Sequence, residues 1–223
     1  MHIPDGYLSP QTGGIFYAIM VPLWALAAKI VKKTLKARQV PYLAFSAAFV
    51  FIIMMFNIPI PGGSTGHAVG GVLAAVLLGP WAAMIAITVA LVVQALLFGD
   101  GGITAIGANC FNMAFIMPFA GYYIYKLIAL GSDKGSFRRA LAAGVGAYVG
   151  LILASFFTAV EFGIQPIFFK NQAGQALYCP YGLKVALPVM LLEHILLFGL
   201  IEAAATFLVI RYLQKEDASL IQL

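Results

Sequence analysis

The amino-acid sequence predicts an all-α, polytopic membrane protein with about seven transmembrane helices. Hydrophobic residues make up 62% of the 223 residues, and charged residues only 9%. Soluble domains are typically about 45–50% apolar and about 25% charged. The apolar residues also gather into long stretches, and a span needs about 20 of them, so the chain accommodates roughly six or seven spans. We therefore expect a single membrane domain over residues 1–223 and no soluble domain.

The apolar stretches give the predicted spans in order. One stretch, 67–98, is divided at Gly79-Pro80, because Gly-Pro breaks a helix, into a short helix followed by a full one. The predicted spans are 12–31, 41–56, 67–79, 80–98, 103–126, 139–162 and 184–212. The loop 163–183 is either a lid or a long connector, and the sequence leaves both open.

The positions of the basic residues predict the orientation of these spans. With seven spans, all but two of the 13 Lys and Arg residues fall on one face, and only Lys170 and Lys184 fall on the other. The positive-inside rule makes the basic face cytoplasmic. The N-terminus is then outside and the C-terminus cytoplasmic. The net charge of +5 thus reflects orientation in a lipid bilayer rather than binding to nucleic acid. The basic connector 29–38 fits either snorkelling lysines or contact with a cytoplasmic partner.

The N-terminus does not have the pattern of a signal peptide. Signal peptides place a basic region before a short apolar region, whereas the first basic residue here is Lys29, after the apolar run. We therefore expect Met1 to be retained. Cys110 and Cys179 form no CxxC pair, which argues against a disulfide or a thiolate metal site. The sequence also has no HExxH, GxSxG or Walker A motif, so we expect a protein that is not an enzyme and hydrolyses no ATP.

His2 combines several potential metal donors in two residues. Its backbone nitrogen lies between the α-amine of Met1 and its own imidazole. Ligation through the amine and the amide nitrogen closes a five-membered ring, and ligation through the amide nitrogen and Nδ1 closes a six-membered ring. Square-planar nitrogen coordination is characteristic of Ni(II) and Cu(II). Such a site needs a fourth nitrogen in the plane.

His67 is a candidate for this fourth nitrogen, since it is predicted to begin the third span on the same face as His2. A helix N-terminus disfavours positive charge, which would keep the imidazole neutral and able to bind metal. Ser64 and Thr65 are candidates to cap this helix start. The residues alone leave a second interpretation open, in which His2 is an unconstrained terminal residue and His67 only forms hydrogen bonds in its loop.

Several other polar residues lie within the predicted spans. Glu193 and His194 lie near the bilayer midplane, where ionisable groups are costly and often functional. They form either a transit site or proton relay, or a hydrogen-bonded pair that fixes helix packing. Asn109 and Asn112, at the external end of their span, are candidates to hydrogen-bond a metal-ligating imidazole.

Four segments together resemble the NikM/CbiM family, the substrate-binding membrane components of energy-coupling-factor transporters for nickel and cobalt. The segments are MHIPDGYL (1–8), PIPGGSTGHAVGG (59–71), GITAIGANCFNM (102–113) and LLEHILLFGLIE (191–202). The resemblance implies a seven-helix fold with the N-terminal segment, residues 1–11, tucked into the protein from outside. It also implies a square-planar metal site made of the Met1 amine, the backbone nitrogen and side chain of His2, and the side chain of His67. The HAVGG sequence (67–71) looks more like the nickel members, although Co²⁺ accepts the same ligands.

The resemblance also implies partners in the prokaryotic plasma membrane. These are a transmembrane coupling protein, two cytoplasmic ABC-type ATPases and a small accessory membrane protein. In such transporters a face of small residues docks on the coupling protein. Ala44 and Ala48, at i and i+4 spacing, are candidates for that face, and ordinary close helix packing explains the same spacing.

Two other functions compete with this prediction. One is a secondary metal-ion transporter or channel that uses Glu193, His194 and Glu202 as an ion path and needs no ATPase. The other is an intramembrane metalloenzyme built from the same residues. Uptake with and without ATPase partners distinguishes the first from a coupled transporter, and a turnover assay tests the second.

Overall fold

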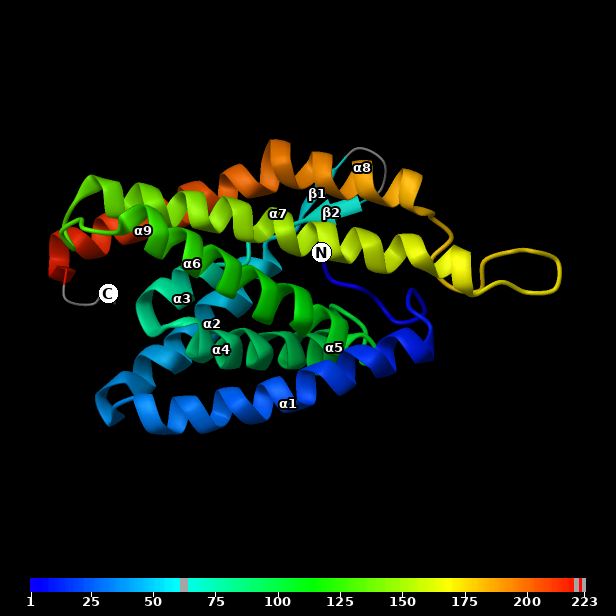
Figure 1. The fold of residues 1–223 in the computed structure, drawn as a ribbon, viewed down its shortest axis with the longest axis horizontal. Coiled ribbons are helices and arrows are strands. Elements are labelled where there is room, and N and C mark those ends of the chain that lie inside the picture. Colours follow the sequence, from blue (N-terminus) through cyan, green and yellow to red (C-terminus); the bar gives the residue numbers. More distant parts are fainter. Residues whose placement is uncertain (61–63, 219–220, 222–223) are drawn as a thin grey trace.

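Long apolar helices run side by side through the structure, a computed structural model that describes residues 1–60, 64–218 and 221 (Figure 1). Three residues of the segment 59–71, which carries the family resemblance, lie outside this described part: Pro61, Gly62 and Gly63. The helices are α1 (Pro10–Thr34), α2 (Val40–Met55), α3 (Gly71–Leu78), α4 (Pro80–Val93), α5 (Ile106–Asn109), α6 (Met117–Ala129), α7 (Phe137–Phe168), α8 (Leu183–Glu193) and α9 (Gly199–Asp217). A 3₁₀ turn, Ala37–Gln39, precedes α2, and a short antiparallel hairpin pairs β1 (Ile58–Ile60) with β2 (Ser64–Gly66).

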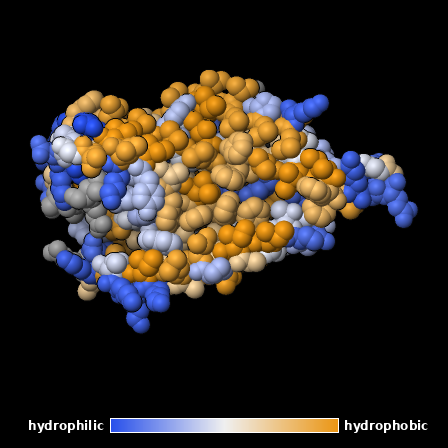
Figure 2. All heavy atoms as spheres, in the orientation of Figure 1, coloured by the Kyte–Doolittle hydropathy of each residue, from blue (hydrophilic) through white to orange (hydrophobic). Residues whose placement is uncertain are grey.

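Three π-helical turns, Gln94–Phe98, Cys110–Ile116 and His194–Phe198, continue the helices that they follow. With them included, the helical stretches long and apolar enough to cross a membrane are Pro10–Thr34, Pro80–Phe98, Phe137–Phe168 and Leu183–Asp217. The helix α2 is apolar but shorter. Figure 2 shows a broad hydrophobic surface around the middle of the molecule and hydrophilic residues gathered toward its two ends. This distribution suits a protein whose middle faces lipid.

Local sequence signals set the helix boundaries. The Ser9 Oγ accepts a hydrogen bond from the Thr12 backbone N–H at 3.1 Å and caps α1, whose first residue is Pro10. Ser136 caps α7 in the same way. The break predicted at Gly79-Pro80 is present: Gly79 has φ +85°, which favours glycine, and it separates α3 from α4.

Several predicted boundaries are wrong. The helix predicted to begin at His67 begins four residues later, at Gly71, with Gly70 as its N-cap. The predicted capping by Ser64 and Thr65 is therefore also wrong, because both residues lie in β2. The physical reason is that Gly70 has a left-handed φ of +73°, and a carboxylate from α9 binds the backbone N–H groups of Val69 and Gly70. The helix α7 also continues to Phe168, six residues beyond the predicted end at 162.

The basic connections lie at one end of the molecule. The connection between α1 and α2, the connection between α6 and α7, and the end of α9 lie together at the left of Figure 1, and the loop after α7 lies at the right. Hydrogen bonds join two of these segments: the Gln214 side chain donates to the backbone oxygens of Lys134 at 2.7 Å and Ser136 at 2.9 Å. Lys170 follows α7 at the opposite end, as the distribution of charge in the sequence predicts.

Candidate metal centre

The chain begins inside the helical framework, and Figure 1 shows the N-terminus at the middle of the molecule. Met1 and Ile3 are buried, whereas Pro4, Asp5, Gly6 and Tyr7 are exposed. Ile3 is fully buried. Its backbone N–H donates to the Asn109 Oδ1 at 2.8 Å, and its backbone oxygen accepts from the Asn109 Nδ2 at 3.2 Å and from the Gly102 N–H at 2.8 Å. Farther along, the Ser9 N–H donates to the Gln165 Oε1 at 3.0 Å. Residues 1–9 are thus held by the backbone and side chains of distant elements.

The chain turns at Pro4-Asp5-Gly6, and the Asp5 carboxylate anchors this turn. Gly6 has φ +83°, and the Tyr7 N–H donates to the Pro4 oxygen at 3.4 Å. The Asp5 carboxylate accepts from the Thr104 hydroxyl at 2.5 Å, the Thr104 N–H at 2.8 Å and the Ile103 N–H at 3.1 Å, and these bonds lower the pKa of Asp5. This turn brings the chain from the buried Ile3 to the start of α1.

His2 and His67 meet at the end of this segment. The Nδ1 of His2 lies 2.9 Å from the Nε2 of His67. The outer nitrogen of each ring has its own partner: the His67 Nδ1 donates to the Ala68 backbone oxygen at 3.0 Å, and the His2 Nε2 donates to the Gln94 Oε1 at 3.2 Å. Because a neutral imidazole has one N–H, these bonds leave the two facing nitrogens with lone pairs. Two lone pairs directed at one point form a site for a cation.

The spacing of the two nitrogens fits a metal ion. Donors at neighbouring corners of a square, with metal–nitrogen bonds of about 2.0 Å, lie about 2.8 Å apart. The observed separation is 2.9 Å. The rings are tilted by 36° with centroids 4.7 Å apart, so they do not stack face to face.

Burial favours the neutral forms of the nitrogen donors in this cluster. It lowers the pKa of the Met1 amine below its usual 8.0, lowers the pKa of His2 to about 3, and lowers the pKa of His67 well below 6.5. Protons therefore compete with a metal for these nitrogens less than they would at exposed groups. The amine should become protonated, and affinity should fall, at a pH below the 7.7–8.0 expected for an exposed amine.

A cavity of about 220 Å³ adjoins the cluster, lined by residues that include Met1, His2, His67, Asp100 and Glu193. The Asp100 Oδ1 lies 3.5 Å from the His2 Nδ1. Burial raises the pKa of Asp100, while the nearby amine opposes that rise. Two carboxylates thus line the same space as the nitrogen donors, and they can offset the positive charge of a bound metal.

The other predicted polar residues have different contacts. Asn109 holds Ile3, and the Asn112 Nδ2 donates to Thr158 at 3.0 Å and to Glu161 at 2.9 Å. Among the described hydrogen bonds neither asparagine reaches an imidazole: Asn109 bonds the backbone of Ile3, and Asn112 joins two helices. Their role beside a metal-ligating imidazole stays a prediction. Glu193 lines the cavity, whereas His194 is fully buried and its Nδ1 donates to the Met190 oxygen at 2.7 Å.

Comparison with known proteins places the chain in a family. The family model for CbiM, described as the cobalt uptake substrate-specific transmembrane region, matches residues 2–220. The chain belongs to the CbiM family. It is a multi-pass membrane protein of a nickel and cobalt transport family, and its relatives are named as transport proteins rather than enzymes.

CbiM-family relatives with similar sequences carry nickel and general metal transport names. The chain is 50% identical over 99% of its length to a fused nickel transport protein NikMN of Rhodobacter capsulatus, covering 64% of that protein. It is 49% identical over 96% of its length to a probable fused nickel transport protein LarMN of Lactiplantibacillus plantarum, covering 65% of it. The chain thus spans less than two thirds of these fused relatives. A putative metal transport protein of Methanocaldococcus jannaschii is 46% identical, and the chain covers 92% of it.

A solved structure has the same CbiM-family fold. A crystal structure of a truncated transition metal transporter superposes with a TM-score of 0.91 at 52% identity, covering 97% of this chain and 99% of that one. The order and packing of the helices described above are therefore shared with a protein described as a transition metal transporter.

Gln94 is a site residue of this CbiM-family chain that sequence reasoning missed. It is fully buried and bonds the His2 ring. It lies in an apolar run, at a position with no motif. The signal that points to it is structural: Gln94 opens a π-helical turn, and His194 opens another, while a third follows Asn109. Single π turns inside helices often mark functional sites.

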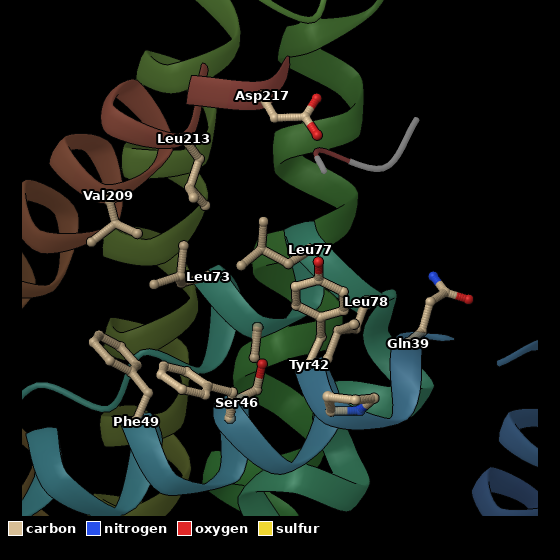
Figure 3. Close-up of a pocket in the computed structure, with 13 residues that line it drawn as sticks. Gln39, Tyr42, Ser46, Phe49, Leu73, Leu77, Leu78, Val209, Leu213 and Asp217 are labelled. Atoms are coloured by element: carbon tan, nitrogen blue, oxygen red, sulfur yellow. The ribbon is translucent and has the colours of Figure 1, made fainter. Parts of the chain in front are cut away.

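Ala44 and Ala48, the predicted docking residues, are exposed on α2. They do not line the large apolar cavity of about 830 Å³ between α2, α3 and α9. Figure 3 shows Tyr42, Ser46 and Phe49 from α2 facing Leu73 and Leu77 from α3 and Val209 and Leu213 from α9. The two alanines thus lie on a different part of the α2 surface, and their docking role stays a prediction.

Proposed function

We propose that this chain binds Ni²⁺ and is the substrate-binding component of an ATP-driven importer in a prokaryotic plasma membrane. The observation that carries the proposal is the pair of imidazole nitrogens, His2 Nδ1 and His67 Nε2, 2.9 Å apart with both outer nitrogens occupied. The remaining two donors are the Met1 amine and the His2 backbone nitrogen. Together they make four nitrogens in a plane, which suits Ni(II).

Nickel is the favoured cargo, with Co²⁺ as an alternative. The relatives with nickel names are 50% and 49% identical to this chain, whereas a cobalt transport protein CbiM of Acetohalobium arabaticum is 34% identical over 72% of it. Copper would bind such nitrogens more tightly, so discrimination against it rests on the shape of the site or on metal supply. No prosthetic group is part of the proposal.

The proposed transport cycle begins at the external face. The chain crosses the membrane about seven times with its basic end in the cytoplasm, an orientation supported by the positive-inside rule. Ni²⁺ displaces protons as it binds, and the N-terminal segment covers it. Partners then drive release to the cytoplasm: a transmembrane coupling protein, two cytoplasmic ATPases and a small accessory membrane protein. The fused names of the relatives support assembly with further subunits.

The decisive experiment adds one residue before Met1 and measures Ni²⁺ binding by calorimetry and visible absorbance. The extension moves the amine out of the chelate while His2 keeps its side chain. Affinity should fall by more than the ~10–100-fold typical of an outer-shell partner, and the square-planar absorption band should change. A matched control inserts the same residue after Gly174, in the exposed loop after α7. Unchanged affinity and absorbance in the N-terminal variant would refute the coordination.

Uptake experiments test the partners separately. Cells that express this chain with the coupling protein and ATPases should accumulate Ni²⁺, and cells with this chain alone should not. Full, proton-driven uptake by the isolated chain would contradict the partner proposal and leave the binding site intact.

A further inference from the structure

The carboxylate of Glu202, in the first turn of α9, holds the segment that carries His67. Its Oε2 accepts from the Val69 N–H at 2.7 Å and from the Gly70 N–H at 3.1 Å, and its Oε1 accepts from the Gly70 N–H at 2.9 Å. Glu202 is fully buried. Consecutive backbone N–H groups directed at one anion form a concave anion-binding arrangement, and the N-terminus of α3 adds a favourable dipole.

The same segment is held from its other side by close packing. A Cβ at Gly66 would lie 2.1 Å from the Phe198 ring, so only glycine fits beneath that ring. Gly70 has φ +73°, which orients its N–H toward Glu202 and favours glycine as well. Both contacts involve the helical stretch from His194 to Asp217. This one helical stretch thus determines the backbone path of the short linker from Gly66 to Gly70.

The linker path sets the direction of the His67 ring. The ring's Nδ1 donates to the backbone oxygen of Ala68, and Ala68 joins His67 directly to Val69. Rotation of the peptide between Ala68 and Val69 would move the carbonyl oxygen and the Val69 N–H together, because the peptide group is planar. Glu202, by fixing that N–H, fixes the oxygen that orients the imidazole.

We propose that Glu202 is a positioning residue of the nickel site, which aims the His67 Nε2 at the metal by holding the backbone of Val69 and Gly70. It binds no metal itself. This inference rests on the proposed function, because it assumes that His67 is a ligand. The same helix, α9, also bonds the α6–α7 connection through Gln214.

The test compares Glu202→Gln with Glu161→Gln in the full-length chain in detergent, with Ni²⁺ as the probe. Glu161 is the matched control: it is a buried glutamate in α7 that bonds Asn112 instead of the linker. Glu202→Gln places an amide N–H₂ against a backbone N–H, so the linker should shift. We expect a ~10–100-fold loss of Ni²⁺ affinity, the range for outer-shell partners, and a shifted visible band. Glu161→Gln should bind like the wild type.

A double substitution shows whether Glu202 acts through His67. His67→Ala leaves the three nitrogens of Met1 and His2 and a weaker, measurable affinity. In that background Glu202→Gln should cause no further loss, because contacts that work through one residue are not additive. If Glu202→Gln lowers the Ni²⁺ affinity of the His67→Ala variant by as much as it lowers that of the wild type, the positioning role is overturned. Wild-type affinity and absorbance in Glu202→Gln overturn it as well.

Two measurements keep the test decisive if Glu202→Gln does not fold. Glu202→Asp keeps the charge on a shorter side chain, and should bind Ni²⁺ with affinity between wild type and the His67→Ala variant. Hydrogen exchange of the wild-type apo protein should show slow exchange at Val69 and Gly70, and fast exchange there overturns the inference. If instead the wild type binds no Ni²⁺, or His67→Ala binds normally, the proposed function fails, not this inference alone.

Discussion

The Nδ1 of His2 and the Nε2 of His67 face each other at 2.9 Å, and neither ring can turn away without losing a hydrogen bond from its outer nitrogen. The site is therefore organised before any cation enters it. Preorganisation of this kind avoids paying for side-chain ordering at the moment of binding.

Replacing Gln94 should weaken Ni²⁺ binding through the tautomer of His2. Gln94→Leu removes the oxygen that accepts the His2 Nε2–H, so the proton is free to occupy Nδ1. Affinity should fall ~10–100-fold. Gln94→Glu retains an acceptor and should recover most of it. ¹⁵N shifts of His2 in the apo protein measure the tautomer directly. An unchanged tautomer and affinity in Gln94→Leu would show that Gln94 is only a packing residue.

Acid should destabilise the apo protein through His2. Its pKa is about 3 in the folded protein and 6.5 unfolded. Between these values the unfolded chain binds more protons, so stability is full above about pH 6.5 and falls as the pH drops toward 3, by up to about 1.4 kcal/mol per pH unit. The lowered amine pKa acts in the same direction. Thermal unfolding at pH 7.5 and 5.0 measures the change. His2→Gln, which does not titrate, should show a smaller one, and an equal pH dependence in both proteins would contradict this assignment.

Asn109→Ala should release the N-terminal segment. The variant removes both side-chain bonds to Ile3 and leaves a buried N–H without that partner, at a cost of about 1–3 kcal/mol. Because the Met1 and His2 donors then lose their fixed position, Ni²⁺ affinity should also fall. Asn112→Ala is the comparison, since Asn112 bonds Thr158 and Glu161; it should lose stability and keep its affinity. Calorimetry on both variants decides, and equal affinity losses would mean that Asn109 has no special role.

His194→Ala should leave the metal site in place. The His194 Nδ1 donates to Met190 in its own helix, and its ring packs on Phe198 with centroids 5.5 Å apart. The change in affinity should stay below about tenfold, smaller than that expected for a ligand. Ni²⁺ titrations beside His67→Ala measure the difference. Loss of binding in His194→Ala with retention in His67→Ala would move the site into the α8–α9 region.

Local signals in the sequence were sufficient for much of the fold. The break at Gly79-Pro80 follows from backbone chemistry, and the gathering of basic residues at one end follows from the order of the spans. The pairing of His2 with His67 could be predicted from the sequence because Met1 and His2 together offer an unusual set of nitrogen donors. The sequence placed His67 at a helix start, however, and the structure places it in a linker before Gly71.

The contacts that complete the site were not reachable from local patterns. Gln94 and Glu202 lie in apolar helices, and their partners lie 92 and 132–133 residues away. Hydropathy and spacing report on neighbours along one element and carry no information about such pairs. The two asparagines illustrate the same limit: they are three residues apart, yet Asn109 bonds Ile3 and Asn112 bonds Glu161.

The burial of the N-terminal segment has a consequence for the order of assembly. Residues 2, 3 and 9 bond to partners 92, 106 and 156 positions later in the chain. Contacts between such distant residues close large loops and form slowly. The N-terminal residues, which are synthesised first, can therefore complete these contacts only after α7 has been inserted. A partly synthesised chain has the histidine but not its neighbours, so the ability to hold metal arrives only late in folding.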